Sequence, residues 1–84
     1  MTLDELKREF AEIDENLRAK LYDDGWMDIN FLIKRKPVLI ASIEVNSPAW
    51  IQIHSDTDIE PEIYFKAVNA FMKFANTKPE ERGI

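Results

Sequence analysis

The sequence predicts an α+β domain of two layers, whose elements follow the order α-β-β-β-α. Two observations lead to this prediction. Between Trp26 and His54, three short runs alternate apolar and polar residues with the period of two that is typical of β-strands. On both sides of that stretch, apolar residues recur every three or four positions, as in an amphipathic helix. We therefore expect a three-stranded antiparallel meander that carries both helices on one face.

The first helix is expected over residues 3–22. One stripe of apolar side chains runs along it at helical spacing: Leu3, Leu6, Phe10, Ile13, Leu17 and Leu21. Thr2 and Glu5 fit a capping box, in which each side chain accepts a hydrogen bond from the backbone amide of the other residue. Asp23, Asp24 and Gly25 favour a turn, so we expect the helix to end before them.

The apolar positions of the three strands form one dry face of the sheet. They are Met27, Ile29, Phe31, Ile33, Leu39, Ala41, Ile43, Val45, Ala49, Ile51 and Ile53. Antiparallel partners must share a face, and a two-residue loop at positions 35–36 would mix the two faces. We therefore expect three-residue loops, which are residues 35–37 in the first hairpin and residues 46–48 in the second.

This register orders the other face of the sheet into rows that cross the strands. One row places Asp28 directly opposite Glu44, with Trp50 beside the pair. Like charges in such a position are destabilising by a few tenths of a kcal/mol or more. On the dry face, the same register sets Ile43 beside Ile51.

The second helix is expected over residues 61–76. Pro61 suits its first turn, where the missing amide needs no partner, and Pro79 cannot belong to it. Apolar residues cover about half of its circumference, so this helix is expected to contact both the sheet and the first helix. Residues 78–84 are expected to fray, and residues 1–84 to form a single domain.

Composition narrows the class of protein. The 84 residues are 45% hydrophobic and 32% charged with only two glycines, which is typical of a globular chain. No apolar run reaches the roughly 20 residues of a membrane-spanning helix, and the acidic N-terminus lacks the features of a signal peptide. The absence of cysteine excludes disulfides, thiol catalysis and thiolate metal sites. We expect a cytoplasmic protein with no membrane contact.

The face opposite the dry one is the first candidate for a functional site. It is too apolar for plain solvated surface and too polar for a second core, and a helix could cover it only by burying charged groups. Aromatic residues beside charged ones are typical of protein interfaces. We expect self-association or binding of another protein through this face. Its candidate residues are Trp26, Asp28, Leu32, Ile40, Glu44, Trp50, Gln52 and His54.

A nucleic-acid-related role is the alternative. Lys34, Arg35 and Lys36 concentrate three positive charges at a hairpin tip and could contact phosphate. The chain could otherwise act as an acidic mimic of nucleic acid through Asp14, Glu15, Asp23 and Asp24. The net charge of −5 argues against a broad nucleic-acid contact, and a basic hairpin tip also protects a sheet from aggregation.

Neither catalysis nor cofactor binding is expected. His54 is the only histidine, and the nearest hydroxyl on its predicted face, that of Ser42, lies on a diagonal beyond hydrogen-bond reach. A metal site would require His54 to converge with Asp56 or Asp58, whose carboxylates are better explained as helix-capping groups. We therefore predict a protein that is not an enzyme and holds no metal.

One resemblance concerns the C-terminal segment. Residues 74–82, with the sequence FANTKPEER, combine an aromatic helix end with Thr, Pro and Glu-Glu-Arg. This segment resembles the endings of small uncharacterised proteins from phages and prophages of Gram-positive bacteria, although Lys78 separates the Thr from the Pro here. The resemblance implies a phage or prophage setting, in which small acidic domains often bind and block a host protein. It assigns no catalytic or binding residue.

Overall fold

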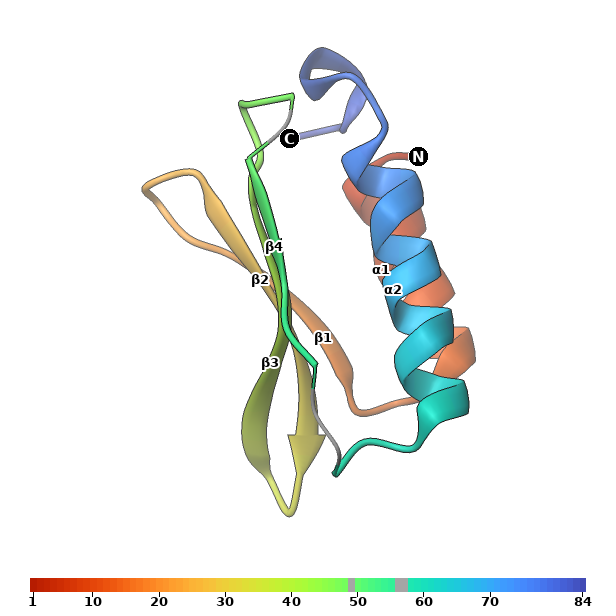
Figure 1. The fold of residues 1–84 in the computed structure, drawn as a ribbon. Helices are drawn as coiled ribbons and strands as arrows, with labels where there is room; N and C mark the ends of the chain where they lie inside the picture. The colour runs from red at the N-terminus through yellow and green to blue at the C-terminus, as the bar shows by residue number, and fades with distance from the viewer. Residues whose placement is uncertain (49, 56–57) are drawn as a thin grey trace.

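Two helices lie on the same face of an antiparallel sheet in the computed structural model of this protein (Figure 1). The structure describes residues 1–48, 50–55 and 58–84. Within this part of the chain the helices are α1 (Leu3–Ile13) and α2 (Pro61–Ala75). The strands are β1 (Leu17–Leu21), β2 (Trp26–Ile33), β3 (Lys36–Glu44) and β4 (Ile51–Ile53), and they pair in the order β1-β2-β3-β4. The α+β class and the antiparallel meander are confirmed, but the described sheet has four strands instead of three.

The expected helix over residues 3–22 is wrong in its second half. Helix α1 ends at Ile13, and Asp14 has extended backbone with φ −164°. The Asp14 carboxylate accepts a hydrogen bond from the Asn16 amide at 2.8 Å, which is the local turn that competes with a helix. Leu17 and Leu21 are four residues apart, a spacing that fits a helix stripe and a strand face equally well. The chain therefore continues as β1.

Both helices begin at the residues that the sequence predicts. The Glu5 amide donates to Thr2 Oγ1 at 3.3 Å, and the Thr2 amide donates to Glu5 Oε1 at 3.0 Å, so the predicted capping box is confirmed. Helix α2 begins at Pro61 and ends at Ala75, close to the predicted limit. The two helices pack against each other as well as against the sheet.

The hairpin between β2 and β3 turns on two residues and not on the three expected. Lys34 and Arg35 both have positive φ, 51° and 65°, which is the geometry of a tight turn that matches strand twist. Ile33 therefore pairs with Lys36, and the expected loop residue Pro37 belongs to β3, opposite Leu32.

A β-bulge at Ile40 keeps the apolar residues of β3 on the face that packs against the core. With the two-residue turn alone, the core residues of β2 would pair with residues of β3 that belong on the other face. The pairing shifts between Ile29, which lies opposite Ala41, and Asn30, which lies opposite Leu39. The extra residue, Ile40, is 1% exposed and belongs to the core. A bulge inserts one residue into one strand, so it restores the alternation that a two-residue turn disturbs.

The pairing of β4 agrees with the predicted register, with Ile43 opposite Ile51 and Ala41 opposite Ile53. Ala49, expected in this strand, lies outside the described residues. The core fills the space between the sheet and the helices. Its buried apolar residues are Leu3, Leu6, Phe10, Leu17, Met27, Ile29, Ile40, Ala41, Ile43, Val45, Ile59, Ala67, Ala70, Phe71, Phe74 and Ala75.

The C-terminal segment is anchored, contrary to the expected fraying of residues 78–84. A short 3-10 helix, η1 (Pro79–Glu81), leads into Arg82, whose side chain is fully buried. Its guanidinium donates to the carbonyls of Val45 (2.7 Å), Ser47 (3.0 Å) and Ala75 (2.9 Å). The Arg82 carbonyl accepts from the Leu3 amide at 2.7 Å. One residue thus ties the end of the chain to the end of β3, to α2 and to α1.

Candidate interaction surface

The sheet face opposite the helices is left uncovered by the described elements of the chain (Figure 1). Along one end of this face, four residues form a row across the sheet. The Tyr22 amide donates to the Trp26 carbonyl at 2.8 Å, and Trp26 lies opposite Glu44. The Glu44 amide donates to the Trp50 carbonyl at 3.0 Å. We call Tyr22, Trp26, Glu44 and Trp50 the aromatic row.

Two tryptophan rings meet within the aromatic row. The ring centroids of Trp26 and Trp50 are 6.0 Å apart and the planes are tilted by 54°. Trp50 remains 64% exposed and Tyr22 is 42% exposed. Since most apolar residues of this size are buried, a row of three aromatic residues of which two are exposed is the unusual feature of this face.

Glu44 occupies the middle of the aromatic row and its carboxylate is held in place. Glu44 Oε1 accepts from the Asn46 amide at 3.3 Å and from Asn46 Nδ2 at 3.4 Å. A Cβ atom on Gly25 would lie 2.6 Å from the same oxygen, and Gly25 has φ +90°. A glycine at the β1–β2 turn therefore supplies both the backbone conformation and the space that this carboxylate uses.

In the next row of residues across the sheet, the expected pair of like charges is not found. Asp28 lies opposite Ser42 on one side and Lys20 on the other, and Ser42 lies opposite Gln52. The prediction that Asp28 faces Glu44 is wrong, because the two-residue turn and the bulge at Ile40 together place Ser42 opposite Asp28. A negative charge on β2 is thus matched by a positive one on β1. Lys20 also places its Nζ 5.1 Å from the centroid of the Tyr22 ring.

Towards the hairpin end, the uncovered face carries aliphatic side chains. Leu32 is half-buried on β2, and Leu39 is half-buried opposite Asn30. Neither belongs to the core or packs against it, which places both on the uncovered side. Leu39 was expected on the dry face, and Ile40 on the open one. The bulge exchanges the two, so Ile40 is not available to a partner.

The remaining predicted residues lie near the edge formed by β4. Gln52 and His54 are exposed. The His54 amide donates to the Ile40 carbonyl at 2.7 Å, and the His54 carbonyl accepts from Tyr64 Oη at 2.7 Å. The imidazole of His54 makes no hydrogen bond to a described side chain, and no catalytic pair forms there among the described residues.

The structure therefore brings together Trp26, Asp28, Glu44, Trp50 and Gln52, with Leu32 further along the face. Sequence reasoning missed Lys20, Tyr22 and Leu39. The first two were assigned to a helix, although Leu17, Ala19 and Leu21 alternate with Arg18 and Lys20 in strand fashion. That alternation is the signal that could have found β1.

The basic residues Lys34, Arg35 and Lys36 are all exposed at the β2–β3 turn. Figure 1 shows this turn at the opposite end of the sheet from the β1–β2 turn, which carries Asp23 and Asp24. The tip thus stands apart from the aromatic row. Phosphate contact through it stays a prediction, as does the role of an acidic mimic.

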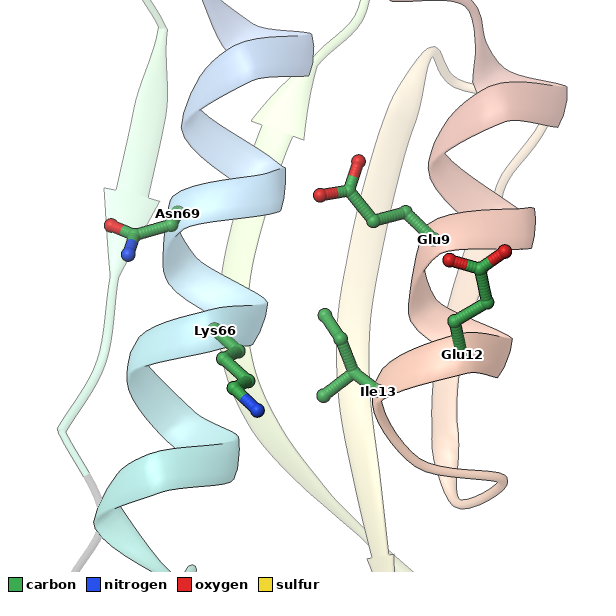
Figure 2. A pocket seen from close by; sticks show the side chains of 5 residues that line it. All are labelled: Glu9, Glu12, Ile13, Lys66 and Asn69. Atoms are coloured by element: carbon green, nitrogen blue, oxygen red, sulfur yellow. The ribbon is translucent and has the colours of Figure 1, made fainter.

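A hollow of about 300 Å³ lies between the helices, lined by Glu9, Glu12, Ile13, Lys66 and Asn69. Glu9 and Ile13 project from α1 towards α2 (Figure 2). Two of its charged groups have partners nearby, since Lys66 pairs with Glu62 at 3.1 Å and Glu9 pairs with Lys73 at 3.2 Å. The volume is at the lower limit for a small-molecule site, and the lining lacks the apolar walls of such sites.

Other kinds of site find little support in the described residues. No group of three or more His, Asp or Glu side chains is placed to hold a metal ion there. None of the helices in the described part of the chain is both long and apolar enough to span a membrane. Comparisons of the chain with protein-family models, curated proteins and solved structures find no match.

Proposed function

We propose that this chain is a small non-enzymatic interaction domain, and that the uncovered sheet face is its contact surface for a protein. One observation carries the proposal. Trp26 and Trp50 meet on a face that no described element covers, and Trp50 keeps 64% of its surface in contact with solvent. Tryptophan and tyrosine supply a large share of the binding free energy in protein interfaces.

The surroundings of the two rings support binding by a protein. Leu32 and Leu39 extend the apolar surface along the face, while Lys20, Asp28 and Gln52 provide polar groups beside it. Protein interfaces combine an apolar centre with a polar rim in this way. The same groups suit catalysis poorly, because the hydroxyl, imidazole and carboxylate groups that the structure describes on this face do not hydrogen-bond to one another.

A matched pair of exposed aromatic residues offers a direct test. Trp50 on the uncovered face is 64% exposed, and Phe65 on helix α2 is 62% exposed. A photo-crosslinking amino acid such as benzoylphenylalanine is placed at one position or the other, and the chain is irradiated in cells of the organism that encodes it. We expect protein adducts from position 50 and not from position 65, because only the former lies on the proposed surface.

Two outcomes contradict the proposal. Adducts from position 65 alone would move the contact surface to the helices, and an absence of adducts from position 50 would remove the proposed one. The phage or prophage setting suggested by residues 74–82 stays a prediction, which sequencing of the genes beside the coding region tests.

A further inference from the structure

We infer that the occupant of the uncovered face is a second copy of this chain, packed face to face with its strands antiparallel to those of the first. This inference rests on the proposed function, since it uses the same surface. The distribution of charge along the strands supports it.

One end of the face is acidic. The β1–β2 turn carries Asp23 and Asp24, and Glu44 lies in the aromatic row at the same end. Asp28 follows one row further in, where Lys20 faces it. The aromatic rings of Tyr22, Trp26 and Trp50 thus lie among an excess of carboxylates.

The hairpin tip at the other end is basic. The turn between β2 and β3 exposes Lys34, Arg35 and Lys36. Figure 1 shows this turn extending beyond the remainder of the sheet, away from the acidic turn. A chain with net charge −5 therefore keeps three adjacent positive charges at one end of one sheet.

The symmetry of a homodimer decides how these ends meet. A two-fold axis along the strands would lay the acidic end of one copy on the acidic end of the other, and opposed like charges disfavour that arrangement. A two-fold axis across the strands lays the acidic end of each copy on the basic hairpin of the other. This contact is attractive, and it occurs twice because the interface is isologous.

The side chains at each end are suited to this contact. A Lys or Arg side chain from the partner's hairpin can lie over Trp26 or Trp50, with the Glu44 carboxylate beside it. The chain already contains one contact of this kind, between Lys20 Nζ and the Tyr22 ring at 5.1 Å. Near the axis, half-buried Leu39 would meet the surface of the other copy.

The size of the face predicts a weak dimer. The four strands have five, eight, nine and three residues, which at ~3.3 Å along and ~4.8 Å between strands give about 400 Å² of projected area per copy. Stable interfaces bury about 800 Å² per partner, so this contact belongs with the weak and transient ones. Electrostatic attraction between the ends then decides whether the dimer forms, and the affinity should fall with added salt.

The test uses two variants, each of which changes the charge at one end of the uncovered face. The acid-end variant is Asp23→Lys with Asp24→Asn, since the Asp24 side chain accepts from the Trp26 amide at 3.0 Å and Asn keeps an acceptor there. The base-end variant is Lys34→Glu with Arg35→Glu. The molar mass of each purified protein is measured by sedimentation equilibrium at low salt, alone and in an equimolar mixture.

We expect the unmodified chain to dimerise, and each variant alone to dimerise about tenfold more weakly, because the end contacts lose their attraction in the acid-end variant and become repulsive in the base-end variant. Mixing the two variants should restore association, as a heterodimer that native mass spectrometry identifies by its mass. The double variant Lys7→Glu with Arg8→Glu on helix α1 makes the same change of net charge as the base-end variant, but away from the face. It should dimerise like the unmodified chain.

Three results would overturn the inference: an unmodified chain that stays monomeric at high concentration and low salt, variants that dimerise normally, or a mixture that shows no heterodimer. If either double variant fails to fold, as judged by circular dichroism, the single variants Asp23→Lys and Arg35→Glu replace them. Failure of the dimer together with adducts from position 50 to another protein would leave the proposed function intact. An absence of any adduct from position 50 would remove both.

Discussion

The indole rings of Trp26 and Trp50 lean towards each other across β3. The two residues lie on either side of that strand, whose neighbours are separated by roughly 9.6 Å, twice the usual strand spacing. Their ring centroids are nevertheless only 6.0 Å apart. The pair therefore forms one continuous aromatic surface instead of two isolated side chains.

Removal of one ring should have a small effect on stability. Aromatic pairs contribute about 0.5–1.5 kcal/mol beyond the area that they bury, and Trp50 is mostly exposed. We expect Trp50→Ala to lower the free energy of unfolding by about 1 kcal/mol, as measured by urea denaturation. A double-mutant cycle with Trp26→Ala isolates the coupling, and a coupling of zero would show that the rings do not stabilise each other.

Arg82 should matter far more to folding than its place near the C-terminus suggests. Arg82→Ala leaves the carbonyls of Val45, Ser47 and Ala75 without their donors and opens a cavity, so we expect a loss of about 3 kcal/mol. Burial also lowers the pKa of the Arg82 guanidinium, which shows that its charge is held at a cost.

Two further variants separate the loss of the Arg82 hydrogen bonds from a general effect of substitution in this segment. Arg82→Lys should recover less than half of the loss, because one ammonium group cannot reach three carbonyls that lie on different segments. Lys78→Ala, at an exposed position of the same segment, should change the free energy of unfolding by less than about 0.5 kcal/mol. Equal effects of Arg82→Ala and Lys78→Ala would contradict the anchoring role of Arg82.

Much of the fold follows from local sequence. The capping box of Thr2 and Glu5, the helix start at Pro61 and the apolar alternation of β2 each depend on neighbouring residues, and each was predicted. The pairing of Ile43 with Ile51 also followed, because both must face the core. These features needed no knowledge of the tertiary structure.

The errors arise where two arrangements fit the same residues. Leu17 and Leu21 fit a helix stripe as well as a strand face, and the turn at Asp14 ends the helix before them. The register of the first hairpin depends on a bulge at Ile40, which no residue type signals. The open face itself was predicted. These two ambiguities explain why Ile40 was wrongly placed on it and why Tyr22 was missed.

The tight turn at Lys34 and Arg35 is strained, because both residues adopt a left-handed conformation that favours Asn and Gly. The double substitution Lys34→Asn with Arg35→Gly supplies the residue types that this turn prefers, and it should raise the free energy of unfolding by about 1 kcal/mol. Urea denaturation at high salt checks this without a contribution from association. A decrease in stability would mean that the turn differs from the one described.

The capping box should make the stability of the fold depend on pH. Hydrogen bonds with the backbone and the side chain of Thr2 lower the pKa of the Glu5 carboxyl from its ordinary value of 4.5. A lowered pKa in the folded state means that Glu5 stabilises the fold above pH 4.5 and that this contribution is lost as the pH falls through the folded-state pKa.

Glu5→Gln keeps a capping side chain that does not titrate. The difference in thermal midpoint between the unmodified chain and this variant should therefore be largest near neutral pH and should shrink as the pH falls below 4.5. A difference that stays constant across this range would show that the Glu5 charge does not contribute to the cap.

The most direct test of the uncovered face as the contact surface is a dilution series followed by amide and indole nuclear magnetic resonance. If two copies meet through this face, the indole N–H signals of Trp26 and Trp50 and the amides of Lys34 and Arg35 should shift together as the protein is concentrated at low salt. Signals from the exposed side of α1 and α2, such as the amide of Lys66, should stay unchanged. Shifts confined to the helices, or signals that do not depend on concentration, would contradict the claim that two copies meet through this face.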